Sequence, residues 1–195
     1  MIGRITGKLV LKQPPLLLVD VGGVGYEIEA PMSTFYKLPA LGENVSLQTH
    51  LTVREDAHLL FGFATATEKT LFRELIKISG VGPKLALTVL SGVSVEDFWN
   101  TIRAGDVARL TKLPGVGRKT AERLVVEMRD KAGAEGESGA GIKLAVDTSA
   151  LGEAKSALTA LGYKPAEIQR FTDAVYKDGM TTEQIIQEAL RRAVK

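Results

Sequence analysis

The sequence contains no cysteine, which excludes a disulfide framework and any metal site built on thiolates. It has only two histidines, His50 and His58, and their separation does not match the spacing of a metal-binding pair. No run of about eighteen apolar residues occurs, so no segment is predicted to span a membrane. Lys8 and Lys12 interrupt the first apolar stretch, a pattern that is not typical of a signal peptide. We therefore expect a cytoplasmic protein without a membrane partner.

The sequence also lacks the loops that usually hold nucleotides. A nucleoside-triphosphate loop needs the pattern G-x-x-x-x-G-K-[ST], whereas Lys119 and Thr120 follow Arg118 and no strand pattern leads into them. The glycine-rich turn at residues 22–25 lacks the third glycine of a dinucleotide loop, because Ile28 stands in that place. We interpret this turn as a β-hairpin, and we expect no cofactor and no catalytic residue.

The net positive charge is small, but the basic residues are unevenly distributed along the chain. The net charge is only +2, with 25 basic and 23 acidic residues. Residues 67–132 hold twelve basic and eight acidic residues, whereas residues 1–66 and 133–195 each carry one more acidic than basic residue. The excess of positive charge in the middle segment indicates where a polyanion would bind, unless it only solvates a helical surface.

The periodicity of apolar residues predicts an α+β multidomain protein. Residues 1–63 read as short strands separated by glycine turns, and the stretch 45–53 alternates strictly between apolar or threonine and polar positions, which favours a small barrel. Residues 64–132 change to a helical period, and we predict helix N-caps at Thr65, Ser94 and Asp106. Trp99 is interpreted as a packing residue.

The last third of the chain reads as a linker followed by a small helical bundle. Residues 133–148 are rich in glycine and poor in large apolar residues, which is typical of a flexible tether. Residues 149–195 contain three short helical patterns, with Gly162 and Gly179 as expected helix ends and a helix start expected at Thr181 or Thr182. A bundle of this size most often binds a protein partner, although a purely structural role stays open.

An internal repeat is the strongest signal in the sequence. The stretch LIKISGVGPKLALTVL begins at Leu75, and LTKLPGVGRKTAERLV begins at Leu110, so the two copies align without gaps at an offset of 35. Seven pairs are identical: Leu75/Leu110, Lys77/Lys112, Gly80/Gly115, Val81/Val116, Gly82/Gly117, Lys84/Lys119 and Ala86/Ala121. The chain therefore contains two copies of a helix, a Gly-Val-Gly turn and a second helix.

Each copy has the composition of an anion site. Glycine allows a ligand to approach the backbone closely, and the helix that follows presents free N–H groups and a partial positive charge. A lysine in the first turn of that helix can reach the same anion, while the valine of the turn is expected to enter the core. Two equivalent sites suit the repeated phosphates of DNA, bound without reading of the base sequence. The predicted phosphate-binding residues are Gly80, Val81, Gly82, Lys84, Gly115, Val116, Gly117, Arg118, Lys119 and Arg123.

The repeat resembles the helix-hairpin-helix motif, and nearly the whole chain resembles the RuvA family of Holliday-junction-binding proteins. The resemblance rests on MIGRITGKL, DVGGVGYEI, TVREDAHLLFGF and both hairpins. It implies an N-terminal OB-fold barrel, a tandem helix-hairpin-helix domain and a mobile, C-terminal three-helix UBA-like bundle. It further implies a homotetramer that binds four-way junction DNA, a C-terminal domain that contacts the hexameric ATPase RuvB, and cooperation with the resolvase RuvC.

The acidic pair Glu55 and Asp56 leaves alternatives open. Both residues are expected at the tip between two strands, where aspartate is common in a solvated turn. The resemblance implies instead that they form an acidic pin facing the centre of the junction. A third interpretation is a structure-specific nuclease of the helix-hairpin-helix class that uses the pair to bind a metal ion, and a protein-only scaffold is a fourth.

Overall fold

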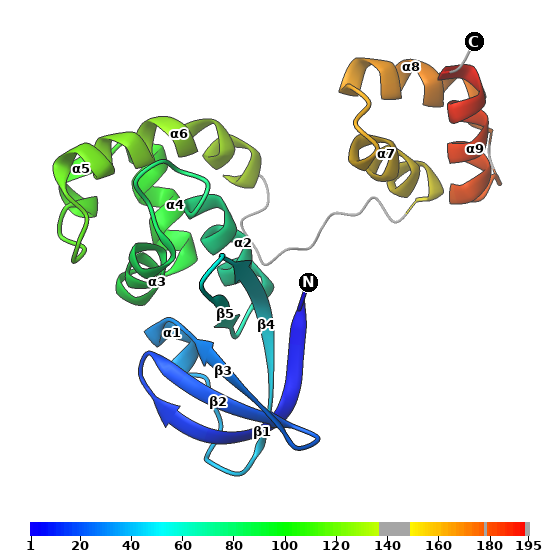
Figure 1. Ribbon diagram of the computed structural model, residues 1–195. Coiled ribbons are helices and arrows are strands. Elements are labelled where there is room, and N and C mark those ends of the chain that lie inside the picture. The colour runs from blue at the N-terminus through cyan, green and yellow to red at the C-terminus, as the bar shows by residue number, and fades with distance from the viewer. Residues whose placement is uncertain (137–148, 178, 194–195) are drawn as a thin grey trace. The chain divides into compact units, whose positions relative to one another are not determined.

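The computed structural model describes residues 1–136, 149–177 and 179–193 (Figure 1). The chain separates into two units, Met1–Gly139 and Ala140–Lys195. The first unit contains a β-barrel and the helices that follow it, and the second unit contains the last three helices. Among the residues that the structure describes, no helix is long and apolar enough to span a membrane.

The expected barrel is formed by five strands, β1 (Arg4–Gln13), β2 (Leu16–Val21), β3 (Val24–Glu29), β4 (Asn44–Val53) and β5 (His58–Phe63). It is closed in the order β1-β2-β3-β5-β4. Strands β1 and β4 pair antiparallel and close one side, while β3 and β5 pair in parallel through Glu29 and Phe61. The core of the barrel includes Leu9, Leu17 and Ile28. The short helix α1 (Met32–Phe35) lies between β3 and β4 in the sequence.

The glycine-rich turn at residues 22–25 is a β-hairpin between β2 and β3, as the sequence predicted. Gly22 and Gly23 have φ angles of 64° and 93°, a region that side-chain-bearing residues rarely adopt. The N–H group of Gly23 donates to Oδ1 of Asp20 at 2.7 Å, which fixes the turn from within. This geometry has no following helix and therefore no relation to a dinucleotide site.

The helical half of the first unit is capped where its sequence predicted. Thr65 accepts from the N–H of Glu68, whose carboxylate accepts in return from the N–H of Thr65, and the side chains of Ser94 and Asp106 cap the helices that follow them. The aligned Leu75 and Leu110 both lie in the core, as does Trp99. The helices are α2 (Ala66–Leu75), α3 (Pro83–Gly92), α4 (Val95–Ala104), α5 (Val107–Leu110) and α6 (Arg118–Gly136).

Helix α2 packs the helices onto the barrel. The ring of Phe72 lies 5.0 Å from that of Phe61 and 4.9 Å from that of Phe63, so one apolar core continues from β5 into the helices. The buried carboxylate of Glu68 accepts a 3.4 Å hydrogen bond from Thr34 and lies 3.6 Å from the ammonium of Lys37. The barrel thereby holds the helical repeat in a fixed position.

Helix α6 extends further than its sequence suggested. It continues through Gly136, so the first four residues of the predicted linker 133–148 are helical. The rest of that prediction, residues 137–148, lies outside the described residues. Glycine is a poor helix former but remains compatible with a helix when no proline follows, which is why composition alone placed the boundary too early.

The second unit consists of the three predicted helices (Figure 1), α7 (Ala150–Ala160), α8 (Pro165–Val175) and α9 (Thr182–Ala193). Its small core is built around Leu158, Ile168 and Ala189. Gly162 follows the C-cap of α7 with a φ angle of 94°, the left-handed geometry expected after a helix. Gly179, the other expected helix end, has a φ angle of 88° but does not end α8, which stops at Val175 and continues into the extended Tyr176.

Candidate nucleic-acid interface

The two Gly-Val-Gly turns have the same backbone geometry. Gly80 and Gly115 adopt φ angles of 86° and 78°. In each copy the N–H of the valine donates to the carbonyl three residues earlier, Val81 to Ile78 at 3.0 Å and Val116 to Leu113 at 3.1 Å. The sequence repeat is therefore a structural repeat, down to individual hydrogen bonds.

The valines anchor the turns and leave the glycines at the surface. Val81 and Val116 retain only 3% and 4% of their exposed area, and burial of each side chain stabilises the fold by about 1.5–3 kcal/mol. Gly82 and Gly117 are exposed, and a Cβ atom at either position would meet nothing within 4 Å. The open space beside these glycines is where an anion could approach the backbone.

Each turn leads directly into a helix whose N-terminus faces that space. Gly82 is the N-cap of α3 and has no side chain to accept a hydrogen bond from the first turn, and Pro83 occupies the first helical position. Gly117 stands in the same place before α6, and its carbonyl accepts from Ala121 at 2.9 Å, as that of Gly82 accepts from Ala86 at 3.0 Å. The remaining first-turn N–H groups have no acceptor within the helix, which makes both sites suitable for an anion.

The four predicted cations differ in their surroundings. Lys84 and Lys119 are exposed, and neither forms an ion pair or a side-chain hydrogen bond within the part of the chain that the structure describes. Arg118 donates from Nε to Glu122 at 2.9 Å. Arg123 donates from Nη1 to the carbonyl of Ser79 at 2.6 Å, so it contacts the turn of the other copy. The two lysines are therefore the cations with the most freedom to meet a phosphate.

The two hairpins also contact each other through their turns. A Cβ atom at Gly80 would lie 3.6 Å from Nη1 of Arg123, and one at Gly115 would lie 3.2 Å from Cδ1 of Leu85. Each turn is thus packed against the helix of the other copy. The spacing between the two anion sites is fixed by this packing, which sequence periodicity did not reveal.

The acidic pair lies at the tip of a tight hairpin, as its sequence predicted. Val53 pairs with His58, and the N–H of Arg54 donates to the carbonyl of Ala57 at 2.8 Å. This bond leaves Glu55 and Asp56 as the two central, exposed residues of the turn. Neither belongs to a group of three or more metal-ligating side chains among the described residues, where no such group occurs. Within the described residues, no further carboxylate or histidine therefore joins Glu55 and Asp56 in such a group.

The two histidines lie on the paired strands β4 and β5 of the barrel. His50 was expected on the polar face of its strand, but α2 covers this face, and the imidazole packs edge-on against Phe72 with 5.6 Å between ring centres. Burial lowers the pKa of His50 below its ordinary value of 6.5, and the nearby charges of Arg73 and Lys69 lower it further. His58 is exposed at the start of β5.

Three family models match separate parts of the chain. Residues 1–62 match the model of the RuvA N-terminal domain, residues 72–130 match the SAM-like helix-hairpin-helix tandem, and residues 149–194 match the RuvA C-terminal domain. These matches correspond to the barrel, the repeat and the last three helices.

Full-length relatives agree with these matches. The chain is 53% identical to the Holliday junction branch migration complex subunit RuvA of Thioalkalivibrio sulfidiphilus over the whole of both chains. It is 56% identical to the protein of the same name from Nitrosococcus oceani over 98% of this chain and 99% of that one, and 52% identical to that from Haemophilus influenzae over the whole of both chains. Identity at this level over the full length leaves no part of the chain unassigned, and the chain belongs to the RuvA family.

Proposed function

We propose that the chain binds four-way junction DNA as the non-catalytic, DNA-binding subunit of a branch migration complex. The observation that carries the proposal is the pair of matched hairpin turns, each with open glycines, a helix N-terminus and an unpaired lysine, Lys84 or Lys119. Such sites bind phosphates without reading bases, which suits a protein that must act at any sequence. The relatives are named as subunits of a Holliday junction branch migration complex, which supports the proposal.

We assign a separate role in junction binding to each segment of the chain. We assign residues 1–63 to the barrel that carries the acidic pin, Glu55 and Asp56, and residues 64–132 to phosphate binding. Residues 149–195 bind the hexameric ATPase RuvB, which supplies the motor, and residues 133–148 connect the two. The subunit acts in the cytoplasm as a homotetramer, because four copies match the four arms of a junction, and it presents the junction to the resolvase RuvC.

The proposed phosphate ligands are the backbone and lysines of both turns, supported by Arg118 and Arg123. Gly80, Val81 and Gly82 with Lys84 form the first site, and Gly115, Val116 and Gly117 with Lys119 form the second. Arg118 is held by Glu122 and Arg123 by Ser79, so their charges lie beside the sites while their side chains are partly engaged within the protein.

The experiment that tests this function compares the dissociation constants of an immobile four-way junction and a linear duplex of equal length, at one salt concentration and in EDTA. Junction binding that is tighter by at least an order of magnitude is expected. A second arm contains Mg²⁺ and measures strand cleavage, which a nuclease would produce and a binding subunit would not. Equal affinity for both DNAs would contradict the proposal.

A further inference from the structure

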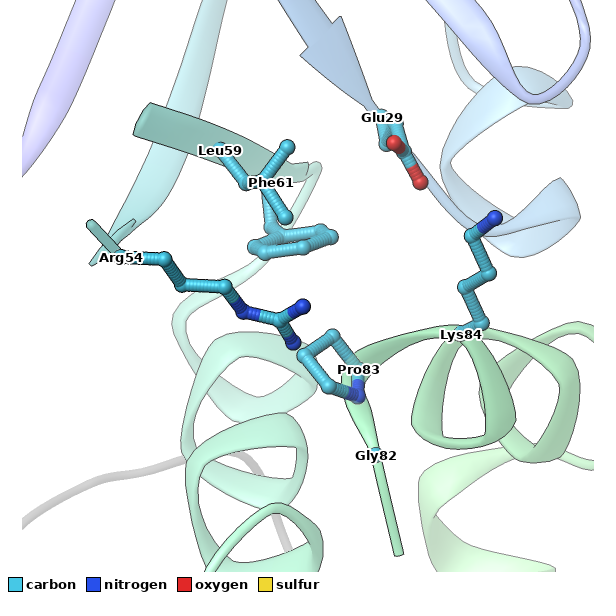
Figure 2. A pocket seen from close by; sticks show the side chains of 7 residues that line it. All are labelled: Glu29, Arg54, Leu59, Phe61, Gly82, Pro83 and Lys84. Atoms are coloured by element: carbon cyan, nitrogen blue, oxygen red, sulfur yellow. The ribbon is translucent and has the colours of Figure 1, made fainter. Parts of the chain in front are cut away.

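A pocket lies between the barrel and the first hairpin, in the same unit of the chain (Figure 2). It has a volume of about 260 Å³. This is slightly below the range of about 300–1,000 Å³ that is typical of sites for small molecules, so it suits one ring system better than a whole cofactor. Its lining residues are Glu29, Arg54, Leu59, Phe61, Gly82, Pro83 and Lys84.

The pocket combines an apolar floor with a charged rim. The half-buried Leu59 and Pro83 supply the apolar surface, and Phe61 also lines the pocket but is only 1% exposed. Figure 2 shows Arg54 reaching from the end of β4 toward Pro83, with Glu29 and Lys84 on the opposite side. Within the described residues, neither Arg54 nor Glu29 has an ion-pair or side-chain hydrogen-bond partner. A flat aromatic ring with polar edges matches such a site.

The position of the pocket indicates what kind of molecule supplies the aromatic ring. On one side, Arg54 immediately precedes the acidic pin, and on the other, Gly82 and Lys84 belong to the first phosphate site. A DNA strand that passes from this phosphate site to the pin therefore crosses the mouth of the pocket. Because like charges repel, Glu29 disfavours a phosphate inside, so the phosphate stays at Gly82 and Lys84 while another part of the nucleotide enters.

We propose that this pocket receives one unpaired nucleobase of the DNA strand at the crossover of the junction, an inference that rests on the proposed function. The base lies on the apolar floor, the guanidinium of Arg54 covers its face, and Glu29 accepts a hydrogen bond from an N–H group at the edge of the base, which each of the four bases can supply. Stacking of bases on planar side chains tolerates every base, which is necessary for a complex that moves along DNA. Capture of the base stabilises the unpaired state beside the pin.

The test uses the full-length chain and two immobile junctions, one intact and one that lacks the base, but keeps the sugar and phosphate, at the same crossover position of each strand. Removal of the base is expected to weaken binding by wild type about fivefold or more, the lower end of the effect of losing one stacking contact. Arg54→Gln, which removes the stacking guanidinium, is expected to lose most of this difference between the two junctions. Glu29→Ala retains the stacking surface and is expected to show a smaller difference than wild type. A side chain that contacts only the phosphate would instead weaken both junctions by the same factor.

Matched controls are Arg4→Gln, an exposed arginine of the barrel, and Glu27→Ala, an exposed glutamate two residues before Glu29 on the same strand. Both should keep the wild-type response to the missing base. The inference is overturned if wild type binds the two junctions equally, or if the pocket variants respond to the missing base as wild type does. In either case, a retained preference for junction over duplex leaves the proposed function standing, whereas loss of that preference in wild type refutes both.

Discussion

The side chain of Arg123 donates a 2.6 Å hydrogen bond to the backbone carbonyl of Ser79 and so joins the second hairpin to the first. In the repeat, the counterpart of Arg123 is Thr88, whose hydroxyl donates to the backbone carbonyl of Lys84 within its own helix. The two copies are therefore equivalent in their turns but not in the contact between them. The relation matters because both phosphate sites must keep one fixed spacing on the DNA.

Arg123→Ala is expected to lower the free energy of unfolding by about 1 kcal/mol, since a charged hydrogen bond contributes about 1.5–3 kcal/mol and this side chain is half exposed. Urea titration followed by circular dichroism measures the change. The matched control is Arg118→Ala, which removes only an exposed pair with Glu122 and should cost no more than about 0.5 kcal/mol. Equal losses in both variants would show that the contact with Ser79 is not structural.

Lys84→Ala and Lys119→Ala should each weaken DNA binding on all sequences alike. Each variant loses about one phosphate contact, so the slope of log K against log salt should fall by about one unit in either single variant and by about two in the double variant. The slope is measured by fluorescence anisotropy at several salt concentrations. Lys8→Ala, an exposed lysine in the barrel, is the control and should keep the wild-type slope. An unchanged slope in the double variant would remove the lysines from the phosphate sites.

His50 should make stability depend on pH in a defined direction. Its pKa in the folded chain lies below the ordinary value of 6.5, so the unfolded chain binds the proton more readily. Its contribution to stability is full above pH 6.5 and is lost as the pH falls below 6.5 through the pKa of the folded chain. His50→Gln should therefore flatten the stability profile below pH 6.5. The matched variant is His58→Gln, at an exposed position, and a response of equal size in both variants would contradict the assignment.

The extent to which the sequence predicted the structure follows from the range of each interaction. The N-caps at Thr65 and Ser94 and the tip at Glu55 were predicted correctly because each depends on residues within one turn. The contact between Arg123 and Ser79 was missed, because it joins residues 44 positions apart and no periodicity encodes it. The pair of Arg118 with Glu122 could have been predicted from its spacing of four.

The other differences between the sequence predictions and the structure arise where segments distant in the sequence pack together. His50 alternates with apolar residues along β4, so it was assigned to solvent, yet Phe72 of α2 covers it. The nucleobase pocket combines β3, the end of β4, β5 and the start of α3, and no motif links these segments in the sequence. The sequence therefore did not single out Arg54 or Glu29 as candidate site residues.

Truncation after residue 148 should separate DNA binding from motor recruitment. The first unit contains its own core and both phosphate sites, whereas the core of the second unit is built from the last three helices alone. The dissociation constant of the truncated chain for the junction is therefore expected to stay within about twofold of the full-length value. This change corresponds to much less than the 1.4 kcal/mol of a tenfold difference in affinity. Stimulation of RuvB-driven branch migration should be abolished. If the truncated chain still stimulates migration, the assignment of residues 149–195 to RuvB binding is wrong.

The acidic pin should favour an open junction by penalising a duplex across its centre. Glu55 and Asp56 are exposed side by side at the hairpin tip, which the bond from Arg54 to Ala57 closes. A carboxylate about 6 Å from a phosphate costs about 0.7 kcal/mol in water and about 3 kcal/mol at an effective dielectric constant near 20. Strands that separate at the crossover avoid most of this repulsion, and four pins in a tetramer would multiply it.

Glu55→Gln with Asp56→Asn retains the size of both side chains and removes only their charge. The double variant should bind linear duplex more tightly than wild type does, and its gain in affinity for the junction should be smaller. The dissociation constant for duplex divided by that for the junction should therefore fall at fixed salt. The control is Glu27→Gln together with Asp20→Asn, which removes two acidic groups from the strands on either side of the β2–β3 hairpin, although Asp20 also caps that turn. Because both pairs change the net charge equally, a general gain in DNA affinity would appear in both. Only the pin pair should change the ratio, and an unchanged ratio would make Glu55 and Asp56 ordinary turn residues.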